Sequence, residues 1–249
     1  MRQYKVRLRK MERIDDLMTH QLKIIQSDEV FSFSLDAVLL ARFCTVPLRG
    51  KIMDLCTGNG VIPLLLTTRT KAIIHAIEIQ ERLADMAERS VIMNELQEQI
   101  HIIRGDLRQT HETFGHGYFD LVTVNPPYLP VINGVQNTNE HFAAARHEVH
   151  CNLEEVIAAC AKLVRAGGKV AMVHRPARLV DIMTLMRQYR LEPKRIRFVH
   201  PRVDEEANMV LIEALKDGKP EVRMLPPVIA FKNKNEYSDE LMQIFYGKE

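Results

Sequence analysis

The chain has 249 residues, a formal net charge of +2 at pH 7, 46% hydrophobic residues and 27% charged residues, which is ordinary for a soluble globular protein. This length allows one large domain, or one domain with a small appendage, around a full core. No apolar run approaches the roughly 18 residues of a membrane-spanning helix, and the basic start is not followed by the apolar core of a signal peptide.

Four cysteines lack Cys-x-x-Cys spacing, so the sequence indicates neither a zinc site nor a disulfide framework: Cys44, Cys56, Cys151 and Cys160. The ten histidines show no metal-ligand spacing either. We therefore expect no metal, no membrane and a reducing, cytoplasmic setting.

Basic side chains gather in two stretches of the sequence. The first is residues 1–13, where six basic residues accompany one acid, and the second comprises Lys194, Arg195, Arg197 and Arg202. Clusters of this kind neutralise the phosphates of nucleic acids. A solvated face or a frayed terminus is an equally good interpretation of either stretch alone.

Short apolar runs alternate with helical patterns along the chain, which is typical of a parallel α/β sheet. The predicted strands are Lys51–Leu55, Ala72–Glu78, Ile100–Arg104, Phe119–Asn125, Lys169–His174, Arg195–His200 and Asn208–Lys216. The predicted helices are Ser34–Phe43, Val61–Arg69, Ile79–Asn94, Leu153–Val164 and Ala177–Tyr189. The turn Ala166-Gly167-Gly168 is expected to end a helix before the fifth strand.

No helical pattern separates the last two predicted strands, so they are expected to pair as an antiparallel hairpin through Pro201–Ala207. The fold class is then α/β, a doubly wound, seven-stranded and mostly parallel sheet with one antiparallel strand. Residues 34–216 form the expected core. Residues 1–33 are expected to be a basic N-terminal extension, and residues 217–249 a C-terminal tail on or near the core.

The first predicted strand leads into the glycine-containing turn Asp54-Leu-Cys-Thr-Gly58-Asn-Gly60, which opens a helix. Glycines there allow close approach of the backbone to a ligand. Glu78 ends the second strand, where an acid accepts hydrogen bonds from both hydroxyls of a ribose. Asp106 follows the third strand, where it can meet the adenine of the same cofactor. Ligands of open α/β sheets bind at these strand ends.

The obvious competitor is a dinucleotide site. Its fingerprint needs a third glycine where this chain has Pro63. Asp54 would also repel a pyrophosphate, whereas it suits the positively charged amino acid end of S-adenosylmethionine. Charge therefore favours S-adenosylmethionine over NAD.

The sequence Asn125-Pro-Pro-Tyr128 closes the fourth strand. Each proline fixes φ and lacks an N–H, so the turn presents carbonyls without paired donors. The Asn125 side chain adds an acceptor, and Tyr128 offers a flat face. This combination suits a planar group with an exocyclic amine, such as adenine, cytosine or a glutamine amide; the alternative is a turn that merely ends a strand.

These motifs together resemble those of class I S-adenosylmethionine-dependent amino-methyltransferases. The segment Phe33–Ala41, the Arg146-His147-Glu148 segment and the Pro226-Pro227 tail are similar to one branch, the bacterial tRNA adenine-N6 methyltransferases that act on valine tRNA next to the anticodon. The resemblance covers roughly residues 25–235. One departure is Cys56, where many relatives have a glycine.

The resemblance implies a Rossmann-like methyltransferase fold with S-adenosylmethionine as cofactor. It implies cofactor roles for Asp54, Thr57, Gly58, Gly60, Glu78, Ile79, Asp106, Leu107 and Asn125, and catalytic roles for Asn125, Pro126, Pro127 and Tyr128. The Asn125 oxygen and the Pro126 carbonyl would accept the two amine hydrogens, and Tyr128 would stack on the target base. The implied partner is an RNA, in particular a tRNA, and we expect a monomer.

Other functions stay open at this stage. A protein glutamine-N5 methyltransferase uses the same turn but carries a sizeable helical N-terminal domain, and DNA adenine enzymes usually need an added recognition domain. A guanine-N2 RNA methyltransferase also fits the turn. An RNA-binding adaptor that keeps the fold without activity would lack cofactor binding.

Two further features are ambiguous. The long segment Leu129–Asn152 carries Arg146, His147 and His150, which are candidates for contact with the substrate. Asp36 lies either near the amino acid part of the cofactor or simply at a favourable helix start.

Overall fold

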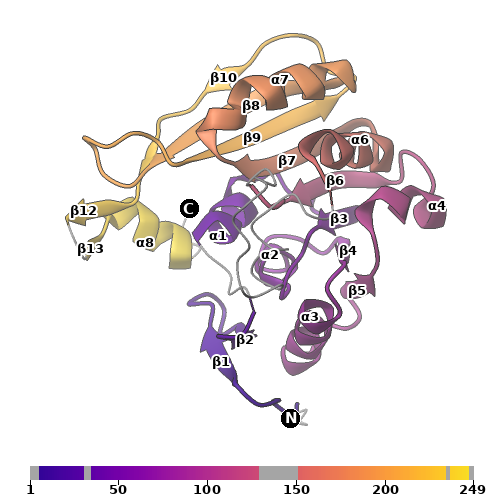
Figure 1. Cartoon of the computed structure of the whole chain (residues 1–249), viewed down its shortest axis with the longest axis vertical. Helices are drawn as coiled ribbons and strands as arrows, with labels where there is room; N and C mark the ends of the chain where they lie inside the picture. The colour runs from indigo at the N-terminus through magenta and orange to yellow at the C-terminus, as the bar shows by residue number, and fades with distance from the viewer. Residues whose placement is uncertain (1–5, 31–34, 129–150, 234–235, 247–249) are drawn as a thin grey trace, which may run out of the picture.

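A computed structural model of the chain describes residues 6–30, 35–128, 151–233 and 236–246. Its centre is a twisted sheet with helices on both faces (Figure 1). Within the described residues the sheet has nine strands, and its path runs β10-β8-β9-β7-β6-β3-β4-β5, with β11 also paired to β8. The strands are β3 (Lys51–Leu55), β4 (Ile73–Glu78), β5 (Ile100–Arg104), β6 (Phe119–Val124), β7 (Val164–His174), β8 (Leu191–His200), β9 (Met209–Lys216), β10 (Arg223–Met224) and β11 (Val228–Ile229).

All seven predicted strands are present, and one of them runs against its neighbours. Strand β9 pairs antiparallel with both β7 and β8, whereas β3, β4, β5, β6 and β7 pair in parallel. The fold class and the predicted β8–β9 hairpin are therefore confirmed. The two short strands β10 and β11, both parallel to β8, were not predicted.

The helices divide between the two faces because the strands alternate their side chains. Ile52 and Leu121 face the apolar cluster with α1, α2 and α8, whereas Met53 and Val122 face the cluster with α6 and α7. The sheet is thus doubly wound, as predicted. The helices are α1 (Leu35–Phe43), α2 (Val61–Leu66), α3 (Glu81–Met93), α4 (Thr110–Phe114), α6 (Leu153–Leu163), α7 (Leu179–Gln188) and α8 (Asp239–Tyr246), with 3-10 turns η1 (Leu107–Gln109) and η2 (Pro176–Arg178).

One predicted turn is wrong. Helix α6 ends at Leu163 and β7 begins at once, so Ala166-Gly167-Gly168 lies inside the strand. The pairing of β6 with β7 shifts register there, which makes the turn a β-bulge. Gly167 has φ +70°, and a Cβ on Gly168 would lie 3.0 Å from the carbonyl oxygen of Asp120. The glycines therefore serve a bulge, where backbone passes close to backbone.

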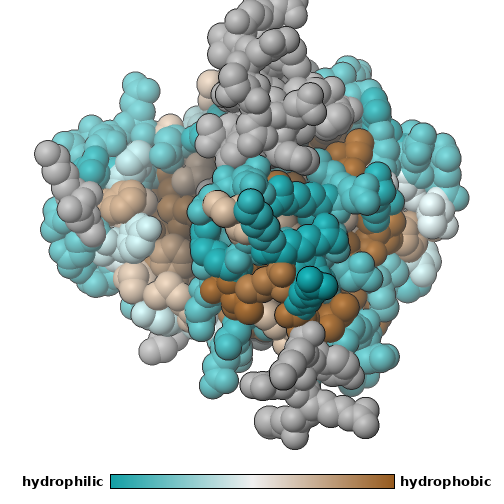
Figure 2. Space-filling view, turned by 60° about the horizontal axis from the view of Figure 1, so that its bottom comes forward, coloured by the Kyte–Doolittle hydropathy of each residue, from teal (hydrophilic) through white to brown (hydrophobic). Residues whose placement is uncertain are grey.

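The N-terminal segment contains an antiparallel hairpin, β1 (Glu12–Asp16) and β2 (Lys23–Ser27), that the sequence did not predict. Arg89 of α3 pairs with Glu12 at 2.7 Å, and the Ser90 hydroxyl accepts a hydrogen bond from the Ile25 amide at 3.0 Å. The hairpin lies at the lower end of the molecule in Figure 1. Figure 2 turns this end forward, with apolar patches among polar side chains.

Among the described residues of the two basic stretches, several cations are paired within the molecule. Arg9 pairs with Asp85, and Arg13 pairs with Asp15. In the second stretch each cation has a partner: Arg195 with Glu213, Arg197 with Glu240, Arg202 with Glu205, and Lys194 with the carbonyl of Lys219. Arg197 also donates to the Pro226 carbonyl, so it links the C-terminal segment to the sheet. This segment includes β12 (Phe231–Asn233), β13 (Glu236–Tyr237) and α8.

Candidate active site

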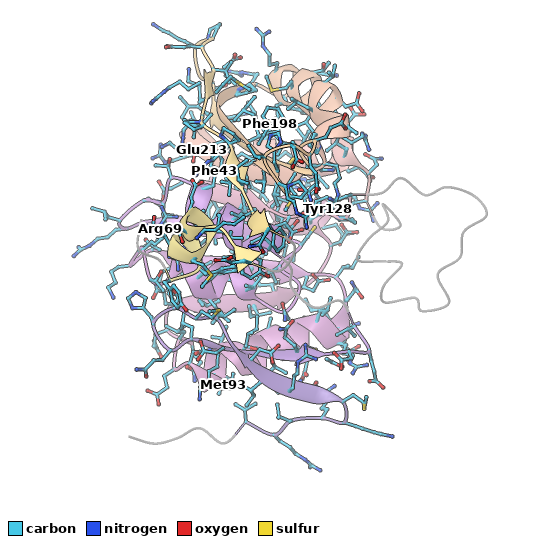
Figure 3. All side chains as sticks on the ribbon, turned by 90° about the vertical axis from the view of Figure 1, so that its left-hand side faces the viewer. Phe43, Arg69, Met93, Tyr128, Phe198 and Glu213 are labelled. Carbon is cyan, nitrogen blue, oxygen red and sulfur yellow. The ribbon has the colours of Figure 1, made fainter. Side chains whose placement is uncertain are left out.

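The register of the parallel strands brings three predicted motifs to one edge of the sheet. Leu55 of β3 stands opposite Ile77 of β4 and opposite Val124 of β6. The residues that follow these strands therefore meet at the carboxyl edge, where ligands of this fold class bind. Tyr128 lies on this side of the molecule, away from Glu213 and Phe43 (Figure 3).

The loop after β3 is held open by its backbone conformation. Gly58 has φ +57° and Gly60 has φ +89°, and a Cβ built on Gly58 would meet nothing within 4 Å. Cys56 also has a left-handed φ of +57°, a conformation that favours glycine. This explains why glycine suits that position, and the thiol residue is accommodated there with some strain. The space in front of Gly58 is available to a ligand.

Glu78 ties the loop to the end of β4. Its Oε2 accepts a hydrogen bond from the Gly58 amide at 2.9 Å, and its Oε1 accepts one from the Gln80 amide at 2.9 Å. The carboxylate is only 6% exposed, and burial raises its pKa. The Gly105 amide donates to the Glu78 carbonyl at 3.0 Å, which adds the loop after β5 to the same cluster.

Asp54 lies beneath the loop and is fully buried. Its Oδ1 accepts a hydrogen bond from the Thr123 hydroxyl of β6 at 2.6 Å, while its Oδ2 has no hydrogen-bond partner among the described residues. Burial raises the pKa of Asp54 to about 7, and the Thr123 hydrogen bond partly offsets this effect. A cation placed over Oδ2 would stabilise the ionised form.

The remaining predicted cofactor residues differ in their surroundings. Ile79 is 38% exposed at the end of β4, whereas Thr57 and Leu107 are buried. Asp106 caps η1 by accepting a hydrogen bond from the Arg108 amide at 2.9 Å, and its carboxylate also pairs with the Arg108 guanidinium. A ligand at Asp106 must therefore share its carboxylate with Arg108.

The Asn125-Pro-Pro-Tyr128 turn follows β6 directly, beside the cofactor loop. Pro126 is buried, and Asn125, Pro127 and Tyr128 are half-buried. The Tyr128 hydroxyl contacts Asp36 Oδ2 at 2.5 Å and also contacts Asn125 Oδ1. One face of the ring is covered by the Arg175 guanidinium, 5.2 Å from the ring centroid. The tyrosine is thus engaged within the protein rather than presented as a free flat face.

Three residues of this neighbourhood were missed in the sequence. Thr123 binds Asp54, His174 packs edge-on against Tyr128 with ring centroids 5.2 Å apart, and Arg175 covers the Tyr128 ring. His174 and Arg175 lie at the carboxyl end of β7, the strand next to β6. Because ligands of open α/β sheets bind at the carboxyl ends of strands, this position in the sequence would have indicated them. Burial and the nearby Arg178 lower the pKa of His174 to about 4, so its imidazole is neutral at pH 7.

Several expectations lie outside the described residues, namely those on Phe33, on Ser34 as the start of the predicted helix, and on Arg146, His147, Glu148 and His150. In the part of the chain that the structure describes, no helix is long and apolar enough to cross a bilayer. No group of three or more histidine, cysteine or acidic side chains that would hold a metal ion occurs within these same ranges.

Curated relatives with sequence similarity to the chain are tRNA1(Val) (adenine(37)-N6)-methyltransferases. The protein of this name from Aeromonas salmonicida is 28% identical over 179 residues, which cover 71% of this chain and 73% of the relative. The one from Tolumonas auensis is 28% identical over 236 residues, covering 90% of this chain and 92% of the relative.

Solved structures with the same fold are methyltransferases of several kinds. A predicted O-methyltransferase from Agrobacterium tumefaciens has a TM-score of 0.68 at 21% identity and covers 84% of this chain and 95% of its own. The tRNA m1G37 methyltransferase of M. jannaschii has a TM-score of 0.58 at 14% identity, and the match covers 86% of this chain and 59% of that one. The family model of the methyltransferase small domain matches residues 21–189, which include the cofactor loop, Glu78 and the Asn125 turn. The chain therefore belongs to the methyltransferase small domain family.

Proposed function

We propose that the protein transfers a methyl group from S-adenosylmethionine to the exocyclic N6 amine of an adenine in tRNA. One observation carries this proposal: the acceptor-rich Asn125-Pro-Pro-Tyr128 turn lies at the same sheet edge as the loop bound by Glu78. A planar amine at the turn would then lie beside a cofactor in the loop. The names of the curated relatives favour adenine 37 of a valine tRNA as the target.

The residues present fit S-adenosylmethionine. Asp54 Oδ2 is a buried acceptor without a hydrogen-bond partner in the described part of the chain, and it suits an ammonium group directly or through water. The space in front of Gly58 admits the methionine part. Glu78 is placed to hold the ribose hydroxyls, and the exposed Ile79 offers an apolar wall to the adenine ring. When bound, the cofactor supplies an electrophilic methyl group on sulfur.

The turn activates the amine by holding it. The lone pair of an aromatic amine is delocalised into its ring, so the amine is a weak nucleophile. Asn125 Oδ1 and the Pro126 carbonyl accept its two hydrogens and favour a pyramidal nitrogen aimed at the methyl group. Positioning and electrostatics then supply most of the rate enhancement. The nitrogen becomes acidic as it is alkylated, so no strong base is required, and the neutral His174 is not needed as one.

The RNA is proposed to approach over the end of β7. Arg175 is exposed there, donates to the Asn208 carbonyl at 2.9 Å and has no acidic partner among the described residues. Arg9 and Arg195 of the basic stretches are paired with Asp85 and Glu213, so these two arginines are poorer candidates for phosphate contacts. Residues 34–216 are proposed as the catalytic core of a monomer acting in the cytoplasm, where its tRNA is found.

The test is a methyl-transfer assay with labelled S-adenosylmethionine. Its substrates are bulk tRNA that lacks native modifications and, in parallel, a release-factor-like protein, and nucleoside mass spectrometry identifies the product. N6-methyladenosine in the tRNA supports the proposal. Label in the protein alone indicates a glutamine-N5 enzyme, and N2-methylguanosine indicates the guanine enzyme.

Glu78→Gln is expected to weaken S-adenosylmethionine binding about tenfold, since one charge-assisted hydrogen bond is replaced by an amide facing a backbone donor. The Glu78 oxygens each accept from a backbone amide, and glutamine satisfies only one of the two. Calorimetry measures the dissociation constant. Glu81→Gln, an exposed acid at the start of α3, is the matched control and should bind normally.

Arg175→Ala is expected to raise the KM for tRNA severalfold and to leave S-adenosylmethionine affinity unchanged. The loss of one phosphate contact should reduce the slope of log affinity against log salt by about 1. Binding of tRNA at several salt concentrations measures this slope. Arg165→Ala, an exposed arginine at the other end of β7, serves as control. An unaltered slope in Arg175→Ala would remove the arginine from the RNA interface.

A further inference from the structure

Three oxygens meet at the active-site turn. The Tyr128 hydroxyl lies 2.5 Å from Asp36 Oδ2 and in hydrogen-bond contact with the side-chain amide of Asn125 at the atom placed as Oδ1. A phenol carries one proton, whereas a carboxylate and an amide oxygen only accept. One proton cannot serve both contacts, so one of the partners must itself be a donor.

The amide of Asn125 resolves the conflict if it is turned over. The oxygen and nitrogen of an asparagine amide have nearly the same shape, so their placement is decided by the hydrogen-bond network. With Nδ2 toward Tyr128, the amide donates to the phenol oxygen, and the phenol donates to Asp36. The Asp36 carboxylate lies in the first turn of α1 and accepts the Ala37 amide at 2.8 Å, so it acts as an acceptor in this arrangement.

We propose that Asp36 is a positioning residue, which acts through the Tyr128 hydroxyl to fix the Asn125 amide with its oxygen toward the target amine. This inference rests on the function proposed above. It also assigns a specificity: the oxygen so placed accepts from an exocyclic amine and rejects a ring carbonyl at the same position, such as that of inosine.

The three residues of this hydrogen-bonded relay, Asn125, Tyr128 and Asp36, are held in place by their surroundings. Asp36 is 6% exposed, and its other oxygen is occupied by the Ala37 amide. The Tyr128 ring is fixed by the edge of His174 and by the Arg175 guanidinium. Burial and the negative Asp36 raise the pKa of Tyr128 well above its usual value, so the phenol keeps its proton. The order of donors therefore starts at Asn125 and ends at Asp36.

Substitution of Asp36 by asparagine should reverse this order. The single amide oxygen of the new side chain is claimed by the Ala37 amide, which leaves its NH₂ facing the Tyr128 oxygen. Tyr128 must then donate to Asn125 Oδ1, and the NH₂ of Asn125 faces the target amine. Tyr128→Phe instead leaves the amide free to take either orientation.

The activity test compares kcat for tRNA in four proteins: wild type, Asp36→Asn, Tyr128→Phe and the double variant. We expect kcat to fall about 50-fold in Asp36→Asn and about fivefold in Tyr128→Phe. In Asp36→Asn the reversed Asn125 amide points its NH₂ at the NH₂ of the target base, so two donors face each other. In Tyr128→Phe the Asn125 amide can still turn its oxygen toward the target amine. The double variant should return to the fivefold level and so be more active than Asp36→Asn. S-adenosylmethionine affinity and the melting temperature should match those of Asp28→Asn, an exposed control.

Losses that simply multiply in the double variant would overturn the relay, since a merely structural role of Asp36 gives no rescue. A wild-type protein without activity on tRNA would instead refute the proposed function. A second measurement needs no substrate: in nuclear magnetic resonance spectra, the Asn125 NH₂ protons should show contacts to the Tyr128 ring in the wild type and lose them in Asp36→Asn. Their absence in the wild type would refute the relay by itself.

Discussion

Replacing Asn125 by alanine is expected to lower kcat by roughly 10²–10³-fold, the usual loss when one preorganised hydrogen-bonding group is removed from a reacting centre. The side chain supplies one of the two acceptors for the target amine, and the Pro126 carbonyl alone cannot fix the nitrogen toward the methyl group. Binding of S-adenosylmethionine should weaken much less than kcat falls, because Asn125 is only one of the expected cofactor contacts and Glu78 holds the loop after β3 independently of the turn. Single-turnover methylation of unmodified tRNA measures the effect.

The control for this change is Asn94→Ala. Asn94 follows the far end of α3, where it binds the backbone of Lys23 in the N-terminal hairpin. Its loss removes side-chain hydrogen bonds to Lys23 and Ser90 without touching the turn, so kcat should stay near that of the wild type. Equal losses of kcat in the two variants would mean that Asn125 acts through stability, and the proposed mechanism would then be wrong.

Much of the fold could be predicted because the central strands are buried on both faces. The run Phe119–Val124, for example, has apolar side chains at four of its six positions and is buried at five of them. The strand-end rule then places Asp54, Glu78 and Asn125 together without any knowledge of register. The structure agrees: Leu55 stands level with both Ile77 and Val124.

The parts that could not be predicted depend on contacts between distant residues. The hairpin β1–β2 is exposed along β1 and is held by Glu12–Arg89 and by the Ser90 hydroxyl, 65 or more positions away in sequence. The same is true of the basic stretches, whose partners Glu213 and Glu240 lie in other elements. A sequence shows the charges but not which of them are already paired.

The bulge at Gly167-Gly168 shows a different limit. Two glycines after a helical pattern indicate a helix end, and the helix does end three residues before them. A Cβ at Gly168 would lie 2.7 Å from the Val164 side chain, 2.9 Å from the Arg165 carbonyl oxygen and 3.0 Å from the Asp120 carbonyl oxygen of β6, so the close packing of the bulge with itself and with β6 leaves no room for a side chain. Local sequence cannot carry that information.

The hairpin also bears on function, since it supports the cofactor loop. The Asn59 side chain in the loop donates to the Ile25 carbonyl of β2 at 3.1 Å, and Arg82 of α3 donates to the Ser27 hydroxyl at 3.0 Å. The loop is therefore backed by a segment that contributes no residue to the expected chemistry. The family match, which begins at residue 21, includes β2 of this hairpin.

Asp54 combines a cost in stability with a proposed role in binding. Its pKa is raised by burial from the usual 3.8 to about 7, so the folded protein without cofactor binds more protons than the unfolded chain between these two values. The stability associated with the protonated form is present at low pH and is lost as pH rises toward 7. Above pH 7 the protein carries a buried charge that only a bound cation would compensate.

Asp54→Asn is therefore expected to stabilise the cofactor-free protein at pH 8 by up to about 4 kcal/mol, since the pKa is raised from 3.8 to about 7 and one pKa unit corresponds to about 1.4 kcal/mol. The gain should vanish near pH 4. The same change should weaken S-adenosylmethionine binding about 10- to 100-fold at pH 8, because the ammonium loses its counter-charge while the Thr123 hydrogen bond is kept. Denaturant unfolding at several pH values and calorimetry measure the two effects. Wild-type affinity should fall as pH drops below 7, and that of the variant should not. A variant that binds as tightly as the wild type would place the ammonium elsewhere.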